Sequence, residues 1–255
     1  MEGLLATYGW AALLASAAIM GVAGFTKGAV GFALPMIAIS GIGSILPAPL
    51  AIAAIILPSL ITNIWQAMRQ GLAEALDSLR RFWLLNAVLL VMIALCAQLV
   101  KILPERALFL ILGAGVTLFS AIQLSGWRPR DPGPDRRVAT GVGLLAGFFG
   151  GLSGVWGPPI VLYLLARKVA KIEMVRVQGI AYLIGSIMLA LAHTNSRLLD
   201  AQTSQFSAAL ILPAMLGMWI GLRVQDALPQ ERFRRLTMAV LVLAGLNLLR
   251  RGLSG

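Results

Sequence analysis

Residues 23–37, AGFTKGAVGFALPMI, decide how the chain is organised, because residues 146–160, AGFFGGLSGVWGPPI, repeat them 123 positions later. Seven of the 15 aligned positions are identical, among them three glycines and a proline. Self-similarity of this kind indicates two copies of one structural plan. We therefore predict a first repeat over residues 1–125, a polar, proline-rich cytoplasmic linker over 126–137 and a second repeat over 138–255.

The composition around these motifs is that of a membrane protein. Of the 255 residues, 59% are apolar and 12% are charged, against roughly 45–50% and about 25% in soluble proteins. These values exclude a soluble enzyme, a secreted scaffold and a disordered chain. The net charge of +11 comes from basic residues in short loops between apolar segments, which is typical of cytoplasmic loops. Since the chain has no basic patch or base-stacking motif, we expect no nucleic-acid partner.

Several apolar segments have the length of about 20 residues that a membrane-crossing helix needs. They are residues 49–68, 83–101, 106–125, 175–193, 205–222 and 234–250.

The two repeated motifs lie in longer apolar stretches, 5–46 and 138–166. We expect residues 26–28 and Gly31 to interrupt the first, and residues 150–154 and the Pro158–Pro159 pair to interrupt the second. The second stretch is either one long broken helix or two half-helices of about 18 Å that enter and return on one side. Basic residues at both of its ends favour the re-entrant form.

With re-entrant stretches, each repeat is a broken stretch followed by three helices. Three crossings are an odd number, so the second repeat is inverted relative to the first. We therefore predict an all-α polytopic membrane protein with two inverted repeats. Secondary transporters with this architecture place their substrate at discontinuous helices near the middle of the membrane.

Glycines at the interruptions can have either of two roles. They permit irregular backbone, whose free N–H groups can bind an anion, or they let two helices pack closely. Their repetition in both halves, beside hydroxyl side chains, favours binding. The candidate substrate-binding residues of this kind are Gly24, Thr26, Gly28, Gly31, Gly150, Gly151, Ser153 and Gly154.

Lys27 is the most informative single residue, because it is the only basic residue that this segmentation places in the interior of an apolar stretch rather than at its end. A charge at that depth costs at least about 2.5–3.5 kcal/mol, so it indicates function, although a lysine can also extend to the membrane surface. All ten Asp and Glu residues fall in loops or at helix ends. One buried cation without a buried carboxylate predicts an anionic substrate.

Further polar and aromatic candidates lie on the second broken stretch and on the helix that follows each broken stretch. Asn63 aligns with Ser186 in the repeat, and Thr62 and Gln66 lie near Asn63. These side chains could bind substrate or join helices, a role worth below about 2 kcal/mol each. The remaining candidates are Trp156, Gln178 and Tyr182.

We expect no catalytic residues, metal site or cofactor. Cys96 and His193 are the only residues of their types. They cannot form a cluster of His and Cys metal ligands or a cysteine pair.

At residues 24–32, GFTKGAVGF, and 147–159, GFFGGLSGVWGPP, the chain resembles the sulfite exporter TauE/SafE family of bacterial membrane permeases. The resemblance covers essentially the whole chain. It implies a bacterial inner-membrane protein that moves sulfur-containing anions such as sulfite, sulfoacetate or related sulfonates. A sulfonate has three acceptor oxygens and one charge, which Lys27, the hydroxyls of Thr26 and Ser153 and backbone N–H groups would match.

We expect a secondary transporter, in the direction of export, that works by alternating access around the two broken helices. The alternative is a membrane assembly factor or scaffold that transports nothing. The expected partners are a small anion and the lipid bilayer, and a homodimer is left open.

Overall fold

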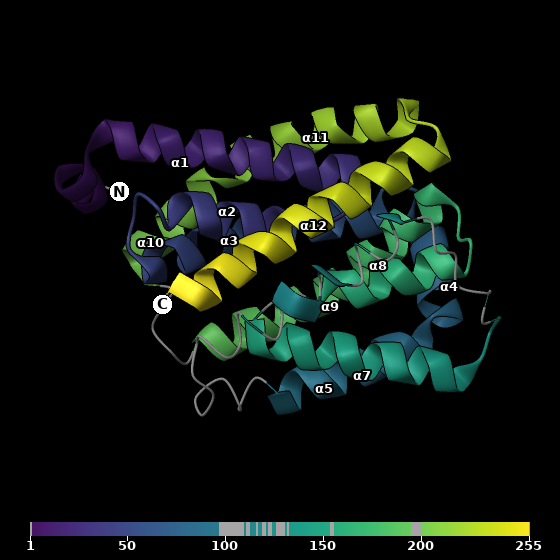
Figure 1. Ribbon diagram of the computed structural model, residues 1–255. Coiled ribbons are helices and arrows are strands. Elements are labelled where there is room, and N and C mark those ends of the chain that lie inside the picture. The colour runs from purple at the N-terminus through teal and green to yellow at the C-terminus, as the bar shows by residue number, and fades with distance from the viewer. Residues whose placement is uncertain are drawn as a thin grey trace. The chain divides into compact units, whose positions relative to one another are not determined.

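The structure is a computed structural model that describes residues 2–96, 133–153, 156–194 and 200–254, and a few residues between 110 and 131 (Figure 1). All regular structure in these residues is helical, which confirms the predicted all-α class. The helices are α1 (Glu2–Val30), α2 (Leu34–Ile42), α3 (Ala48–Met68), α4 (Leu72–Arg81), α5 (Trp83–Cys96), α7 (Arg136–Ser153), α8 (Gly157–Ala166), α9 (Lys171–Thr194), α10 (Ala201–Ala209), α11 (Ile211–Ala227) and α12 (Gln230–Ser254).

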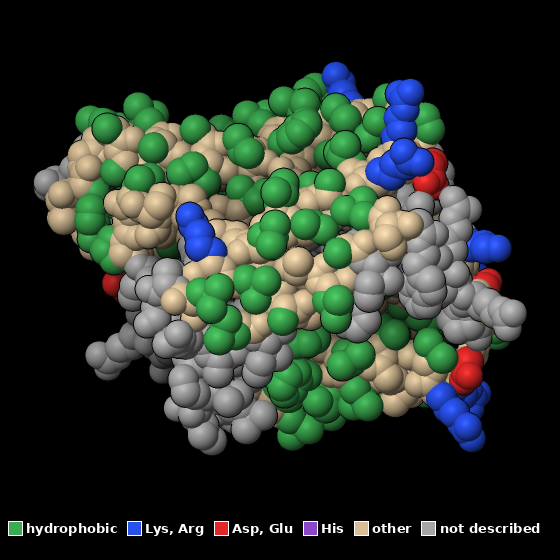
Figure 2. Space-filling model, in the orientation of Figure 1, with side chains coloured by type: hydrophobic (Ala, Val, Ile, Leu, Met, Phe, Trp, Pro, Cys, Tyr) green, Lys and Arg blue, Asp and Glu red, His purple; other side chains and the backbone are tan. Residues whose placement is uncertain are grey.

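Several of the described helices are suited to a bilayer. Thr7–Val30, Leu50–Met68 and Ala201–Ala227 are each long and apolar enough to cross a membrane. The pair α4 and α5, which bend by 79° where they meet, adds a fourth span if the two are one broken crossing. In Figure 2, hydrophobic side chains cover the flanks of α1 and α11, while Lys and Arg gather near helix ends. A multi-pass membrane protein has this distribution.

The predicted segments and the observed helices agree best where the sequence is uniformly apolar. Helix α3 reproduces the predicted 49–68 to within one residue, and α9 and α12 enclose the predicted 175–193 and 234–250. The predicted 106–125 lies mostly outside the described residues. The residues between the predicted segments 49–68 and 83–101, which the sequence indicated to be a cytoplasmic loop over 69–81, are not all loop, because residues 72–81 form α4, a short helix with four charged residues.

Both broken stretches are more helical than predicted. Helix α1 continues through residues 26–28, so the interruption predicted there was wrong, and the break comes at Gly31–Ala33. Gly31 and Ala33 have φ angles of 90° and 81°, a backbone that ends the helix. Helix α7 likewise continues through Gly150 and Gly151 and has 18 residues, about 27 Å, rather than the predicted 18 Å.

In each broken stretch the second helix folds back on the first. A Cβ atom on Gly41 of α2 would lie 2.6 Å from the Ile19 side chain of α1. After α8, the Arg167 guanidinium lies 3.5 Å from Asp131, which precedes α7. The chain thus leaves α8 near the residues that lead into α7.

The chain forms two compact units. One comprises Met1–Gln66 with Ser186–Ala227, and the other comprises Ala67–Gly185 with Leu228–Gly255. In the first unit α1 packs along α11, and in the second α5 packs along α7. Each unit therefore combines segments from both halves of the sequence.

Glycines set the distance between α1 and α11. A Cβ on Gly24 would lie against the carbonyl oxygen of Ala214 and 2.9 Å from its carbonyl carbon, and one on Gly28 would lie 2.9 Å from the Leu222 nitrogen. Gly217 and Gly221 approach the backbone of α1 in the same way. The two helices meet backbone to backbone, as in GxxxG contacts, and this packing holds the last turns of α1 in place.

Candidate functional site

The candidate site centres on the side chain of Lys27, near the end of α1. The residue is 2% exposed. Its Nζ donates a hydrogen bond to Thr62 Oγ1 at 2.8 Å and another to Asn63 Oδ1. The lysine therefore does not extend to the surface of its unit, but ends on the polar side of α3.

Helix α3 supplies a line of buried polar groups. Ser59, Thr62, Asn63 and Gln66 occupy positions i, i+3, i+4 and i+7, which place them on one helix face. Thr62 Oγ1 also donates to the Pro58 carbonyl at 2.6 Å, so its oxygen is oriented by its own helix.

Two further bonds extend this arrangement. Asn63 Nδ2 donates to Ser186 Oγ at 3.1 Å, which brings α9 into the site. Gln66 Nε2 donates to the Gly31 carbonyl at 2.9 Å, which satisfies a backbone oxygen where α1 ends. We call Lys27, Thr62, Asn63, Gln66 and Ser186 the lysine site.

No acid balances the lysine among the described residues. The buried polar and charged side chains include two basic residues, Lys27 and Arg176, but no Asp or Glu. The two hydrogen-bond acceptors of Lys27 are neutral oxygens. An ammonium group buried without an opposite charge is costly, and an anion is the ligand that would relieve this cost.

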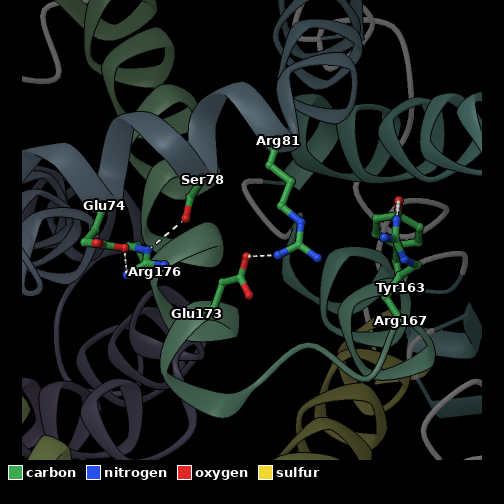
Figure 3. A network of polar contacts seen from close by, with 7 residues as sticks. All are labelled: Glu74, Ser78, Arg81, Tyr163, Arg167, Glu173 and Arg176. Carbon is green, nitrogen blue, oxygen red and sulfur yellow. Dashed lines mark hydrogen bonds and ion pairs between the residues drawn. The ribbon is translucent and has the colours of Figure 1, made fainter. Parts of the chain in front are cut away.

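Arg176 differs from Lys27 in its surroundings. Its Nε donates to Ser78 Oγ at 2.8 Å, and its NH1 lies 3.5 Å from Glu74 Oε2 (Figure 3). Arg176 does not stand out in the sequence, because it lies at the very start of the segment predicted over 175–193. Glu74 supplies the opposite charge, so a structural role is enough to explain why Arg176 is buried.

In the second unit, Trp156 follows the break between α7 and α8 and is buried between two glycines. A Cβ on Gly150 or on Gly185 would lie 2.8 Å from the indole ring. The centroids of the Trp156 and Tyr182 rings are 6.1 Å apart. Gln178, one turn before Tyr182, is fully buried, and neither atom of its amide has a hydrogen-bond partner among the described residues.

The other predicted residues have different positions. Gly24 and Gly28 face α11, so they have the helix-packing role that the sequence left open. Thr26 Oγ1 bonds the Val22 carbonyl of its own helix at 3.0 Å. Gly151 is buried within α7. Gly154 and the side chain of Ser153 lie outside the described residues.

The model of the sulfite exporter TauE/SafE family matches residues 16–248 of the chain. The chain belongs to this family. The matched region contains every residue of the lysine site, the whole α7–α8 hairpin and the α1–α2 hairpin from residue 16 onward. No curated protein and no solved structure gives a significant match. Membership of TauE/SafE makes the chain a multi-pass membrane protein of a transporter family, and sulfite is the substrate that the family's description names.

Proposed function

We propose that the protein exports small sulfur-containing anions, such as sulfite, sulfoacetate or related sulfonates, and that the lysine site binds them. The observation that carries this proposal is the buried Lys27, whose hydrogen bonds go to neutral oxygens. Family membership supports the same class of substrate.

The donors of the lysine site suit such an anion. An ammonium group has three N–H donors, and Lys27 directs two of them to Thr62 and Asn63. The third can reach a sulfonate or sulfite oxygen, and the Ser186 hydroxyl and the Asn63 amide can turn toward the anion. Hydrogen bonds to a charged acceptor are roughly twice as strong as neutral ones.

We also infer two inverted repeats. The element order α1, α2, α3 followed by α4 and α5 recurs as α7, α8, α9 followed by α10 and α11. In this correspondence α1 is equivalent to α7, and α11 is equivalent to α5. The packed pair α1 and α11 of one unit is therefore equivalent to the packed pair α7 and α5 of the other.

The hydrogen bond between Asn63 and Ser186 supports this inference. The two residues are 123 positions apart, the same offset that relates the repeated motifs. Residues that a two-fold axis exchanges can touch each other only close to the axis. We therefore infer that equivalent residues of the two repeats meet at the lysine site, as they would at the substrate site of a transporter with inverted repeats.

The repeats differ where charge matters. The position equivalent to Lys27 is Gly150, and the position equivalent to Thr62 is Gly185. In the second unit the Trp156 indole fills the space between those two glycines. We propose that the protein binds one anion, at the ammonium group of Lys27. The equivalent position in the second repeat has no charge, and we propose that Trp156 fills it.

Within the second repeat, Gln178 is the strongest further candidate for substrate contact. A buried amide without partners costs about 1–3 kcal/mol, and such groups in native proteins commonly meet a ligand or water. We propose the same contact for Tyr182, and for Gly150, Gly151, Ser153 and Gly154 at the α7–α8 break.

We propose alternating access as the mechanism, with the α1–α2 and α7–α8 hairpins as the discontinuous helices. The membrane potential favours outward movement of one negative charge by about 2.3 kcal/mol per 100 mV.

Thermal unfolding of the purified protein with a panel of anions tests the proposed substrate class. The panel is sulfite, sulfoacetate, taurine, thiosulfate, sulfate and acetate. A ligand at 100 times its Kd stabilises by about 2.7 kcal/mol. We expect a sulfur anion to raise the Tm of the wild type and not that of Lys27→Gln. A well-folded protein that responds to none of the six would favour the non-transporting scaffold.

A further inference from the structure

Helix α4 has three distinct faces. Ala75 and Ser78 are buried against the rest of the unit. Leu72, Leu76 and Leu79, at positions i, i+4 and i+7, form a stripe that is exposed by 57%, 43% and 36%. The charged residues lie on the remaining face or at its edges, and they are Glu74, Asp77, Arg80 and Arg81.

Polar contacts fix the rotation of α4 about its axis. Ser78 accepts a hydrogen bond from Arg176 of α9 at 2.8 Å, and Arg81 pairs with Glu173 at 2.7 Å (Figure 3). Figure 3 shows these contacts leaving one side of the helix. The helix therefore cannot turn its leucine stripe toward its own unit without losing both contacts.

The leucine stripe of α4 is followed in the chain by an exposed apolar face on α5. The exposed side of α5 carries only apolar side chains, including Trp83, Leu90, Val91 and Leu95. Leu85, Leu89 and Ile93, on the other side, are buried. The exposed face of α5 thus has the composition of a lipid-facing surface. Because α4 and α5 bend by 79°, an α5 that crosses the bilayer leaves α4 running along the bilayer surface.

We propose that α4 lies in the headgroup region of the membrane, with its leucine stripe at the acyl boundary and Arg80 bound to the phosphate of an anionic phospholipid. Arg80 follows Leu76 by four residues, so it lies at the edge of the stripe. Its side chain is exposed, and its stem can follow the apolar surface while the guanidinium reaches a phosphate. An apolar stripe beside basic residues is the pattern of interfacial helices.

The bilayer fits this surface better than a protein partner does. The stripe continues through Trp83 into the apolar face of α5. A partner that covered the stripe would therefore have to enter the hydrocarbon region as well. Lipid meets both surfaces without any such partner.

Spin labels on α4 test the position of the stripe. Cysteines replace Leu72, Leu76 and Leu79, one at a time, in a Cys96→Ala protein reconstituted in phosphatidylcholine vesicles. Ala73→Cys and Asp77→Cys are matched controls on the charged face. We expect labels on the stripe to collide more with oxygen than with a water-soluble nickel chelate, and labels at 73 and 77 to show the reverse.

Brominated lipids test the anionic partner. A fluorophore at position 76 is quenched by brominated phosphatidylglycerol or by brominated phosphatidylcholine at equal bromine content. We expect Arg80→Gln to reduce the preference for the anionic lipid about fivefold, since one arginine near the surface contributes about 1 kcal/mol. Arg80→Lys should keep most of the preference, and Arg235→Gln on α12 should leave it unchanged.

Two results would overturn the proposal. Labels at 72, 76 and 79 that are as open to the nickel chelate as the label at 77 would place the stripe in water. Immobile labels shielded from both reagents would show a protein covering the stripe, either a second copy of the chain or a different partner. Neither readout depends on anion transport, so the outcome is separate from that of the proposed function.

Discussion

Replacing Lys27 by methionine separates anion binding from folding, because we expect it to weaken binding strongly and to change the stability little. Methionine is a flexible, unbranched side chain that can fill much of the same space without a charge. Removal of the ammonium group relieves at least about 2.5–3.5 kcal/mol on insertion scales. It also removes the hydrogen bond that Asn63 Oδ1 accepts from Lys27, at a cost of about 1–3 kcal/mol.

The unfolding free energy of Lys27→Met should therefore lie between about 0.5 kcal/mol below and 2.5 kcal/mol above that of the wild type. Thr62 adds little to this sum, because its hydroxyl still donates to the Pro58 carbonyl. Anion binding should weaken far more. A hydrogen bond to a charged group contributes about 1.5–3 kcal/mol, or a 10- to 150-fold change in Kd.

Two measurements on the same sample check this prediction. Denaturant unfolding in detergent micelles gives the stability difference, and titration calorimetry with sulfite gives the Kd. A variant that loses more than about 3 kcal/mol of stability while its Kd for sulfite is unchanged would refute the reasoning, because Lys27 would then be a structural residue.

Three further predictions concern single residues in other parts of the structure. Gly28→Ala should lower the unfolding free energy by about 1–3 kcal/mol, because the new methyl group would meet the backbone of α11. Gly21→Ala on the same helix, where a Cβ would lie 3.7 Å from the nearest atom, is the matched control and should change the Tm little. Gln178→Leu should raise the Tm, since it removes a buried amide without partners, and should reduce the Tm shift caused by sulfite; an unchanged Tm shift would place Gln178 outside the substrate site. Asp200 caps α10, and its bonds to Thr203 hold the pKa of the carboxyl below its usual value. The cap therefore stabilises the helix above the unfolded-state pKa of Asp200, and this stabilisation is lost as the pH falls through the folded-state pKa. Amide exchange in the first turn of α10 should become faster at low pH in the wild type, beyond the intrinsic change of the exchange rate with pH. Asp200→Ala should not show this additional increase.

The sequence predicted the helices that are apolar throughout, because length and hydropathy are local properties. It did not predict α4, whose four charged residues in ten lower its hydropathy to that of a loop. The spacing of Leu72, Leu76 and Leu79 was the available signal, and it requires a search for helical periodicity rather than for mean hydropathy.

The lysine site was partly predictable for a related reason. Lys27 stands out by its charge in an apolar stretch, and the structure brings it together with Asn63 and Ser186, which the sequence also singled out. The roles of Gly24 and Gly28 could not be decided from the sequence. Their packing depends on α11, nearly 200 residues later in the chain, and no local pattern encodes that contact.

Flux of radiolabelled sulfite through vesicles that contain the purified protein tests the central claim most directly. Wild-type protein and Lys27→Met are reconstituted at equal density, with protein-free vesicles as the baseline. The lysine site predicts rapid sulfite movement in the wild type and at least about a tenfold loss in the variant. Equal flux through the two proteins would contradict the claim that Lys27 holds the anion, and flux no faster than the protein-free baseline in either would contradict sulfite transport itself.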